Sequence, residues 1–175
     1  EPYRRQRQMC IRDRYIAVQS DPNYIFRNDW EEPSYGRDAD NDVFTKLAKT
    51  NNDGTITDYG ATFEDAVISG NGTYTCSMTT GDMGFGEDTA FHFFRVSTDI
   101  PSKLVKEGYV TISDVTIKIG EGKTQSGVVV DTSGDWVKLI VEDNYNNIKA
   151  DGVVLTAPAP NTTTVFTFTV SGLAE

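Results

Sequence analysis

The sequence contains few of the residues on which most catalytic centres rely. Its 175 residues include one His and two Cys, and no apolar run approaches 18 residues. A single His excludes a metal site built on a His pair, and the missing apolar run excludes a membrane-spanning helix. That one His, His92, lies in the run Ala90-Phe-His-Phe-Phe94, which favours a strand position over a general base. These absences disfavour an enzyme.

Positive charge is also scarce. The chain has 16 Lys and Arg against 26 Asp and Glu, a formal net charge of -10. Nucleic-acid backbones and anionic lipid surfaces would repel such a chain. We therefore expect neither nucleic acid nor a membrane as a partner.

Residues 1–14 differ in composition from everything that follows. The ten residues Arg4–Asp13 back-translate, codon by codon, into a common transposase-based sequencing adapter. We interpret residues 1–14 as translated adapter, and we expect the native start to be missing. Removing their five Arg and two acids leaves 11 basic and 24 acidic side chains in residues 15–175, a net charge of -13. Cys76 is then the only cysteine, so no intrachain disulfide forms.

Strand patterns dominate residues 15–175. Residues 73–79, 136–141 and 164–170 alternate apolar with other side chains at the period of a half-buried strand. Between residues 110 and 119 the alternation changes phase, and a bulge or turn at Ser113-Asp114 would restore one inward face. Further strands are predicted at residues 15–19, 61–68, 90–97 and 127–130, and one short helix at residues 42–49.

This arrangement predicts the fold class. Many short strands separated by Gly-rich turns, with almost no helix, are typical of sandwiches and jelly rolls. We predict an all-β, antiparallel, jelly-roll-like β-sandwich that forms one domain over residues 15–175, and we expect a monomer.

Several aromatic residues lie outside the strand alternation, among Asn, Asp and Arg. Sugars present apolar C–H faces ringed by hydroxyls, so their sites pair a flat ring with amide, carboxylate or guanidinium groups. The candidate ligand-binding residues are Tyr24, Arg27, Asp29, Trp30, Tyr35, Trp136, Asn144 and Tyr145. The alternatives are that Phe26 and one of the two Trp fill the core and that Arg27 only pairs with Asp29.

One acidic segment is a candidate metal site. Asp38, Asp40 and Asp42 place three carboxylates at alternate positions, an arrangement that can converge on Ca²⁺. It is not an EF-hand, because Val43 and Lys49 replace its Gly and its bidentate acid. The alternative is a solvated acidic loop, and no cofactor is required in either case.

Catalysis by two carboxylates is the remaining enzymatic hypothesis. A glycosidase needs only two acids across a cleft, and Glu64 and Glu142 are the acids nearest to predicted strands. Cys76 falls on the apolar face of its predicted strand, which argues against a nucleophilic thiol.

From Tyr15 onward, the chain resembles a known group of modules. The resemblance is carried by residues 15–19, 28–30, 68–75, 96–101, 115–120, 143–145 and 166–173. These segments are similar to the β-sandwich carbohydrate-binding-like modules of secreted glycoside hydrolases and surface proteins of fibre-degrading gut bacteria. The resemblance implies a jelly-roll-like sandwich, an extracellular or cell-surface location and no catalytic activity. It also implies a ligand site around Tyr24, Arg27 and Trp30, with Asn144 and Tyr145 nearby.

We therefore expect a non-catalytic module that binds a neutral plant polysaccharide or oligosaccharide. It would belong to a larger extracellular glycan-degrading protein, beside catalytic or anchoring modules. The alternative from another class is a structural or adhesive spacer of a bacterial surface protein, with Trp30 and Trp136 both buried. A small paired-carboxylate glycosidase is the third hypothesis.

Overall fold

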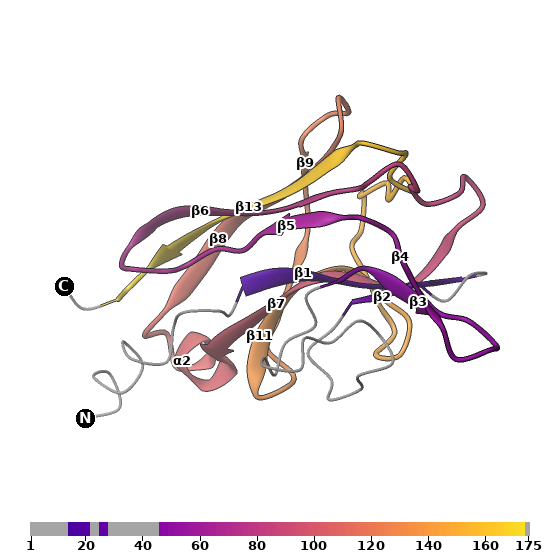
Figure 1. Cartoon of the computed structure of the whole chain (residues 1–175). Coiled ribbons are helices and arrows are strands. Elements are labelled where there is room, and N and C mark those ends of the chain that lie inside the picture. The colour runs from indigo at the N-terminus through magenta and orange to yellow at the C-terminus, as the bar shows by residue number, and fades with distance from the viewer. Residues whose placement is uncertain (1–13, 22–24, 28–45, 174–175) are drawn as a thin grey trace.

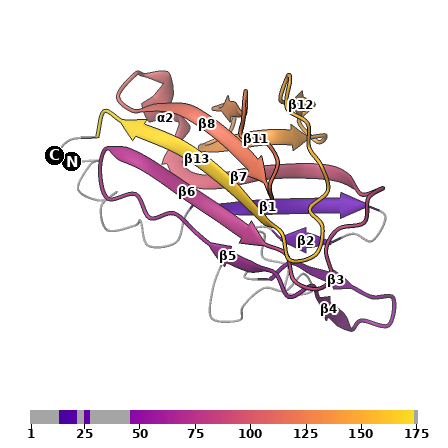
Figure 2. The same cartoon turned by 90° about the horizontal axis from the view of Figure 1, so that it is seen from above.

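The chain folds into two antiparallel β-sheets stacked face to face, as the sequence predicts (Figure 1). The computed structural model describes residues 14–21, 25–27 and 46–173. Seen from above, the strands of one sheet run at an angle across those of the other (Figure 2). The molecule is thus an all-β sandwich.

The larger sheet, called here the β1 sheet, has the strand order β10-β11-β7-β1-β2-β3-β4, with β12 beside β11. Its strands are β1 (Arg14–Asp21), β2 (Phe26–Arg27), β3 (Ala48–Thr50), β4 (Ile56–Asp58), β7 (Ala90–Pro101), β10 (Val129–Asp131), β11 (Trp136–Asp143) and β12 (Ile148–Lys149). The long central strands β1, β7 and β11 form most of its hydrogen-bonded ladder.

The smaller sheet, called here the β13 sheet, has the order β5-β6-β13-β8-β9. Its strands are β5 (Thr62–Glu64), β6 (Gly72–Thr79), β8 (Thr111–Ile119), β9 (Gln125–Ser126) and β13 (Thr163–Ser171). The chain passes repeatedly between the two sheets, so each sheet combines strands from distant parts of the sequence.

The core fills the space between the two sheets. Cys76 and Met78 on β6 are fully buried, as are Phe166 and Phe168 on β13, which confirms the predicted alternation. Phe94 of β7 stacks on Phe166 with ring centroids 6.1 Å apart and so joins the two layers. Each fully buried aromatic or aliphatic side chain contributes about 1.5–3 kcal/mol.

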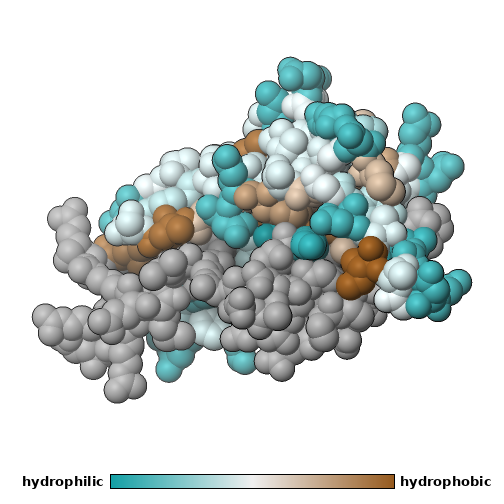
Figure 3. Space-filling model, viewed as in Figure 1, coloured by the Kyte–Doolittle hydropathy of each residue, from teal (hydrophilic) through white to brown (hydrophobic). Residues whose placement is uncertain are grey.

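Exposed hydrophobic residues are scattered over the described part of the chain. On the face shown in Figure 3, hydrophobic residues form small separate patches among hydrophilic ones. Among the described residues, no helix has the length and apolarity that a bilayer-spanning segment requires.

The predicted phase change on β8 is a β-bulge. The pairing of β8 with β13 shifts between Thr167 and Thr169, and Asp114 has a left-handed φ of 51°. The extra residue returns Val115 to the same inward face as Ile112, and both are buried. The bulge prediction is confirmed.

A second bulge, on β11, was not predicted. Ile140 pairs with Arg95 and Asp143 pairs with Phe93, with a register shift between Ile140 and Glu142. Arg95 and Phe93 lie two residues apart on one face of β7, while their partners on β11 lie three apart. The additional residue therefore places Asp143 beside Arg95 instead of facing the core.

The predicted helix is wrong where the structure describes it. Residues 42–45 lie outside the described residues, and Ala48–Thr50 is strand β3, paired with β4. The helical spacing was misleading because cross-strand pairing overrides weak local propensity. A helix that the sequence did not predict, α2 (Ser102–Lys106), follows β7. Strand β5 spans only residues 62–64 of the predicted 61–68.

Candidate functional site

The structure describes four of the predicted ligand-binding residues. These are Arg27, Trp136, Asn144 and Tyr145. The other predicted site residues, Tyr24, Asp29, Trp30, Tyr35, Asp38, Asp40 and Asp42, lie outside the described residues. Their sugar-binding and calcium-binding roles stay predictions.

Arg27 lies inside the protein. It is 3% exposed, and its Nη1 donates to the carbonyl oxygen of Ile16 at 2.9 Å. Its Nη2 is 3.5 Å from Asp65 Oδ1, and its guanidinium lies 3.4 Å from the centroid of the Phe63 ring. Burial lowers the pKa of Arg27 to about 10, so it remains a cation at neutral pH. This position does not support the predicted contact with a sugar.

Trp136 and Tyr145 lie near opposite ends of β11. Trp136 is the first residue of that strand, and Tyr145 follows its last residue by two positions. Because a strand advances about 3.3 Å per residue, the two ends of this eight-residue strand are roughly 23 Å apart. Trp136 is 47% exposed, so it does not fill the core. The two rings belong to separate places on the surface.

Tyr145 is a supported but exposed ring. It is 62% exposed, in the turn between β11 and β12. Its ring lies 5.8 Å from the His92 ring at an interplanar angle of 28°, and 6.4 Å from the ring of buried Phe93. Contact with two rings of β7, one stacked and one tilted, limits the orientations of Tyr145 while leaving much of its surface open to solvent.

A carboxylate borders this stack. Asp21 Oδ2 is 2.7 Å from His92 Nε2, and both side chains are partly exposed. The pair forms because the end of β1 lies beside the start of β7, where Asp21 pairs with Ala90. His92 therefore occupies the predicted strand position and also makes a surface contact that the sequence did not reveal. Asp21 carried no local signal, because it lies two residues beyond the strand predicted at residues 15–19.

Asn144, the residue before Tyr145, is held by two hydrogen bonds to β7. Its backbone N–H donates to the carbonyl oxygen of His92 at 2.7 Å, and its Nδ2 donates to that of Phe91 at 3.1 Å. The side-chain amide is thus oriented by β7 although the residue is exposed. We call Tyr145, His92, Asp21 and Asn144 the Tyr145 platform.

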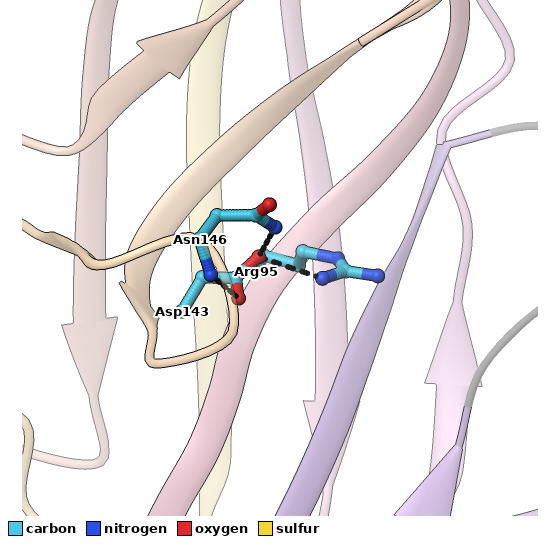
Figure 4. A network of polar contacts seen from close by, with 3 residues as sticks. All are labelled: Arg95, Asp143 and Asn146. Carbon is cyan, nitrogen blue, oxygen red and sulfur yellow. Dashed lines mark hydrogen bonds and ion pairs between the residues drawn. The ribbon is translucent and has the colours of Figure 1, made fainter. Parts of the chain in front are cut away.

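A buried ion pair holds the turn that carries Asn144 and Tyr145 (Figure 4). Arg95 Nη1 donates to Asp143 Oδ2 at 3.0 Å, and Asp143 is fully buried. The same carboxylate accepts hydrogen bonds from Asn146 Nδ2 at 2.9 Å and from the Asn146 backbone N–H at 3.2 Å. Arg95 also lies 4.1 Å from the centroid of the Phe93 ring. The turn is therefore tied to β7 on both sides of Tyr145.

An open pocket of about 510 Å³ lies at the end of the β13 sheet. Its walls come from the end of β8, the turn at Gly120 and the start of β13. Lys118, Glu121, Asn161 and Thr163 supply polar groups, but its lining contains no aromatic residue. It therefore lacks the flat apolar surface that the Tyr145 platform offers to a sugar.

The described residues give little support to the predicted carboxylate catalysis. Glu64 and Glu142 lie in different sheets, and Glu142 Oε1 is 4.0 Å from Lys149 Nζ. Within residues 14–21, 25–27 and 46–173, no three His, Cys, Asp or Glu side chains gather as metal ligands. Cys76 is buried and forms no disulfide, as its strand position predicted.

Comparison with known proteins leaves the site to be judged on its own geometry. No family model, no curated protein and no solved structure matches this chain.

Proposed function

We propose that this chain is a non-catalytic carbohydrate-binding module in which Tyr145 stacks on a sugar ring. The observation that carries the proposal is an aromatic ring left 62% exposed on a turn that a buried ion pair holds in place. An exposed ring whose orientation is fixed before binding favours ligand binding, because such a preorganised ring loses little conformational entropy in the complex.

The polar groups around the ring support a sugar as the ligand. Asp21 and Asn144 border Tyr145 through their contacts with His92, and each has an oxygen that can accept a hydroxyl hydrogen bond. An exposed ring that stacks on an imidazole held by a carboxylate, with an amide on the neighbouring residue, suits a molecule with C–H faces and peripheral hydroxyls. We propose a neutral polysaccharide or oligosaccharide as this molecule.

We place the module in a larger extracellular glycan-degrading protein. One exposed ring with a few hydrogen bonds gives weak binding, with a dissociation constant on the order of 1 mM. Tethering to a neighbouring catalytic or anchoring module raises the effective affinity without adding any contact.

Affinity electrophoresis against a panel of neutral plant polysaccharides tests the proposal. We expect at least one polymer to retard the native protein and Tyr145→Ala to remove most of that retardation. The matched control is Tyr109→Ala, because Tyr109 is 57% exposed but lies between α2 and β8. If no polymer retards the protein, or if both variants migrate alike, the proposal is wrong.

The spacer hypothesis loses one of its expectations. It required both Trp side chains to be buried, and Trp136 is 47% exposed. An exposed indole and an exposed, oriented tyrosine both favour a binding role over a purely mechanical one.

A further inference from the structure

We infer that Asp21 sets the specificity of the Tyr145 platform: it favours glycans that present free hydroxyl groups and disfavours glycans that carry carboxylates. The inference rests on the proposed function and adds a chemical class of ligand and the residue that selects it.

Asp21 can accept a further hydrogen bond at its second carboxylate oxygen. Its Oδ2 is engaged by His92 Nε2 at 2.7 Å, and its side chain is 51% exposed. Its Oδ1 has no hydrogen-bond partner among the described residues and remains available at the edge of the ring stack. A carboxylate oxygen accepts hydrogen bonds only, and a hydroxyl that donates to it forms a bond roughly twice as strong as a neutral one.

The other described acids near the Tyr145 platform have cationic partners. Asp143 is compensated by Arg95, and the more distant acid Glu142 lies 4.0 Å from Lys149. Arg95 is buried, so it offers no cation to a ligand at the surface. Among the described residues, Asp21 is the acidic side chain that contacts the ring on which Tyr145 stacks.

The free oxygen and the charge of Asp21 together select the ligand. A sugar hydroxyl can donate to the second oxygen of Asp21, whereas a uronate carboxylate would meet the like charge of that side chain. Two like charges about 5 Å apart near a protein surface reduce affinity by about tenfold or more.

The test uses one polysaccharide in three chemical forms. We take the polymer that retards the protein most strongly and compare its native form with a partly oxidised form, in which primary alcohols are carboxylates, and with an acetylated form. For a xylan, which lacks primary alcohols, glucuronate side chains supply the charge. We expect both modified forms to bind about tenfold more weakly than the native polymer.

Asp21→Asn distinguishes the role of this residue. We expect it to bring the affinity for the oxidised form within about threefold of that for the native form, while the acetylated form stays weak. Asp114→Asn removes the same charge from an exposed position on β8 of the other sheet, and Asn tolerates the left-handed φ there. We expect this control to keep the native discrimination.

A second measurement needs no variant. Raising the ionic strength screens the repulsion between Asp21 and the oxidised polymer, because the Debye length falls from about 10 Å at 0.1 M salt to about 3 Å at 1 M. The discrimination of the native protein should shrink accordingly.

The outcomes separate the two proposals. Equal binding of native and oxidised polymer by the native protein, or unchanged discrimination in Asp21→Asn, overturns the role of Asp21 and leaves the Tyr145 proposal standing. A polysaccharide panel that retards nothing overturns both.

Discussion

Asp114 has a backbone conformation that β-strand residues rarely adopt. Its φ of 51° places it in the left-handed region, at the bulge that returns Val115 to the core. Asp and Asn occupy this region more readily than branched residues, because their short polar side chains bond locally. A single residue therefore maintains the inward alternation along β8.

Substitutions at Asp114 test this account. We expect Asp114→Gly and Asp114→Asn to change the free energy of unfolding little, and Asp114→Val to lower it by about 1–2 kcal/mol. Urea unfolding of the three variants gives the comparison. Equal stabilities of the Val and Gly variants would contradict the structural role of the left-handed φ.

Asp53 illustrates a local electrostatic effect in the turn between β3 and β4. Its Oδ1 accepts hydrogen bonds from the Thr55 hydroxyl at 2.6 Å and from the Thr55 backbone N–H at 3.0 Å. These bonds favour the carboxylate and lower the pKa of Asp53 below its ordinary value of 3.8. The resulting stabilisation is fully present above pH 3.8 and is lost as the pH falls through the lowered pKa.

An NMR titration of the carboxyl carbon of Asp53 checks this effect. We expect a pKa below 3.8 in the native protein and a higher one in Thr55→Val, which removes the hydroxyl donor and keeps the backbone N–H. Thr89→Val, in a turn away from Asp53, is the control. An identical pKa in the native protein and Thr55→Val would show that the hydroxyl does not act on Asp53.

At the scale of elements, the bulge on β11 decides how the turn after it is held. Simple alternation would point Asp143 into the apolar core with Val137, Leu139 and Val141, where a carboxylate is costly. The extra residue places Asp143 beside Arg95 on β7 and at the base of the turn that carries Tyr145. The exposed Tyr145 ring thus depends on the buried ion pair between Arg95 on β7 and Asp143 at the end of β11.

Breaking this pair should affect stability and binding together. We expect Asp143→Asn to lower the free energy of unfolding by about 3 kcal/mol, because it leaves the buried Arg95 cation unpaired. The double variant Arg95→Met/Asp143→Asn should recover a large part of this loss, because the cation is gone. Denaturant unfolding measures both effects.

Polysaccharide retardation of the same variants separates positioning from stability. The Arg95→Met/Asp143→Asn protein should fold but bind more weakly, because its Tyr145 turn keeps only the Asn144 hydrogen bonds to β7. Unchanged retardation in this double variant would show that the ion pair stabilises the fold without orienting the ring.

For the whole molecule, the sandwich separates its two described exposed aromatic candidates. Trp136 and Tyr145 lie near opposite ends of β11, and each is accessible from solvent. A ligand on Tyr145 therefore need not contact Trp136 unless it is an extended chain.

Tryptophan fluorescence tests the exposure of Trp136. We expect acrylamide to quench its emission readily and Trp136→Phe to remove this quencher-accessible component. If the native protein shows only blue-shifted, protected emission, Trp136 is buried in solution and the spacer hypothesis regains its support.

Prediction from sequence succeeded where the signal was local. The alternations at residues 73–79 and 164–170, the phase change near Asp114 and the strand position of His92 all appear in the structure. The strands β2, β9 and β12 are two residues each, which is too short for any period to be recognised. The pairing of Asp21 with His92 could not be predicted, because these residues are 71 positions apart and meet only through strand pairing.

The amino-acid sequence by itself determined that this is an all-β protein whose strands have one side facing the core and one facing solvent. This alternation of side chains along a strand does not depend on which strand lies next to it. Tertiary structure alone decided which strands became neighbours, that Asp143 turned toward Arg95, and that Arg27 was buried while Tyr145 stayed exposed. The physical reason is that inward and outward positions follow from local periodicity. The meeting of distant side chains instead follows from strand register and bulges, which hydrogen bonding and packing across the whole sheet select.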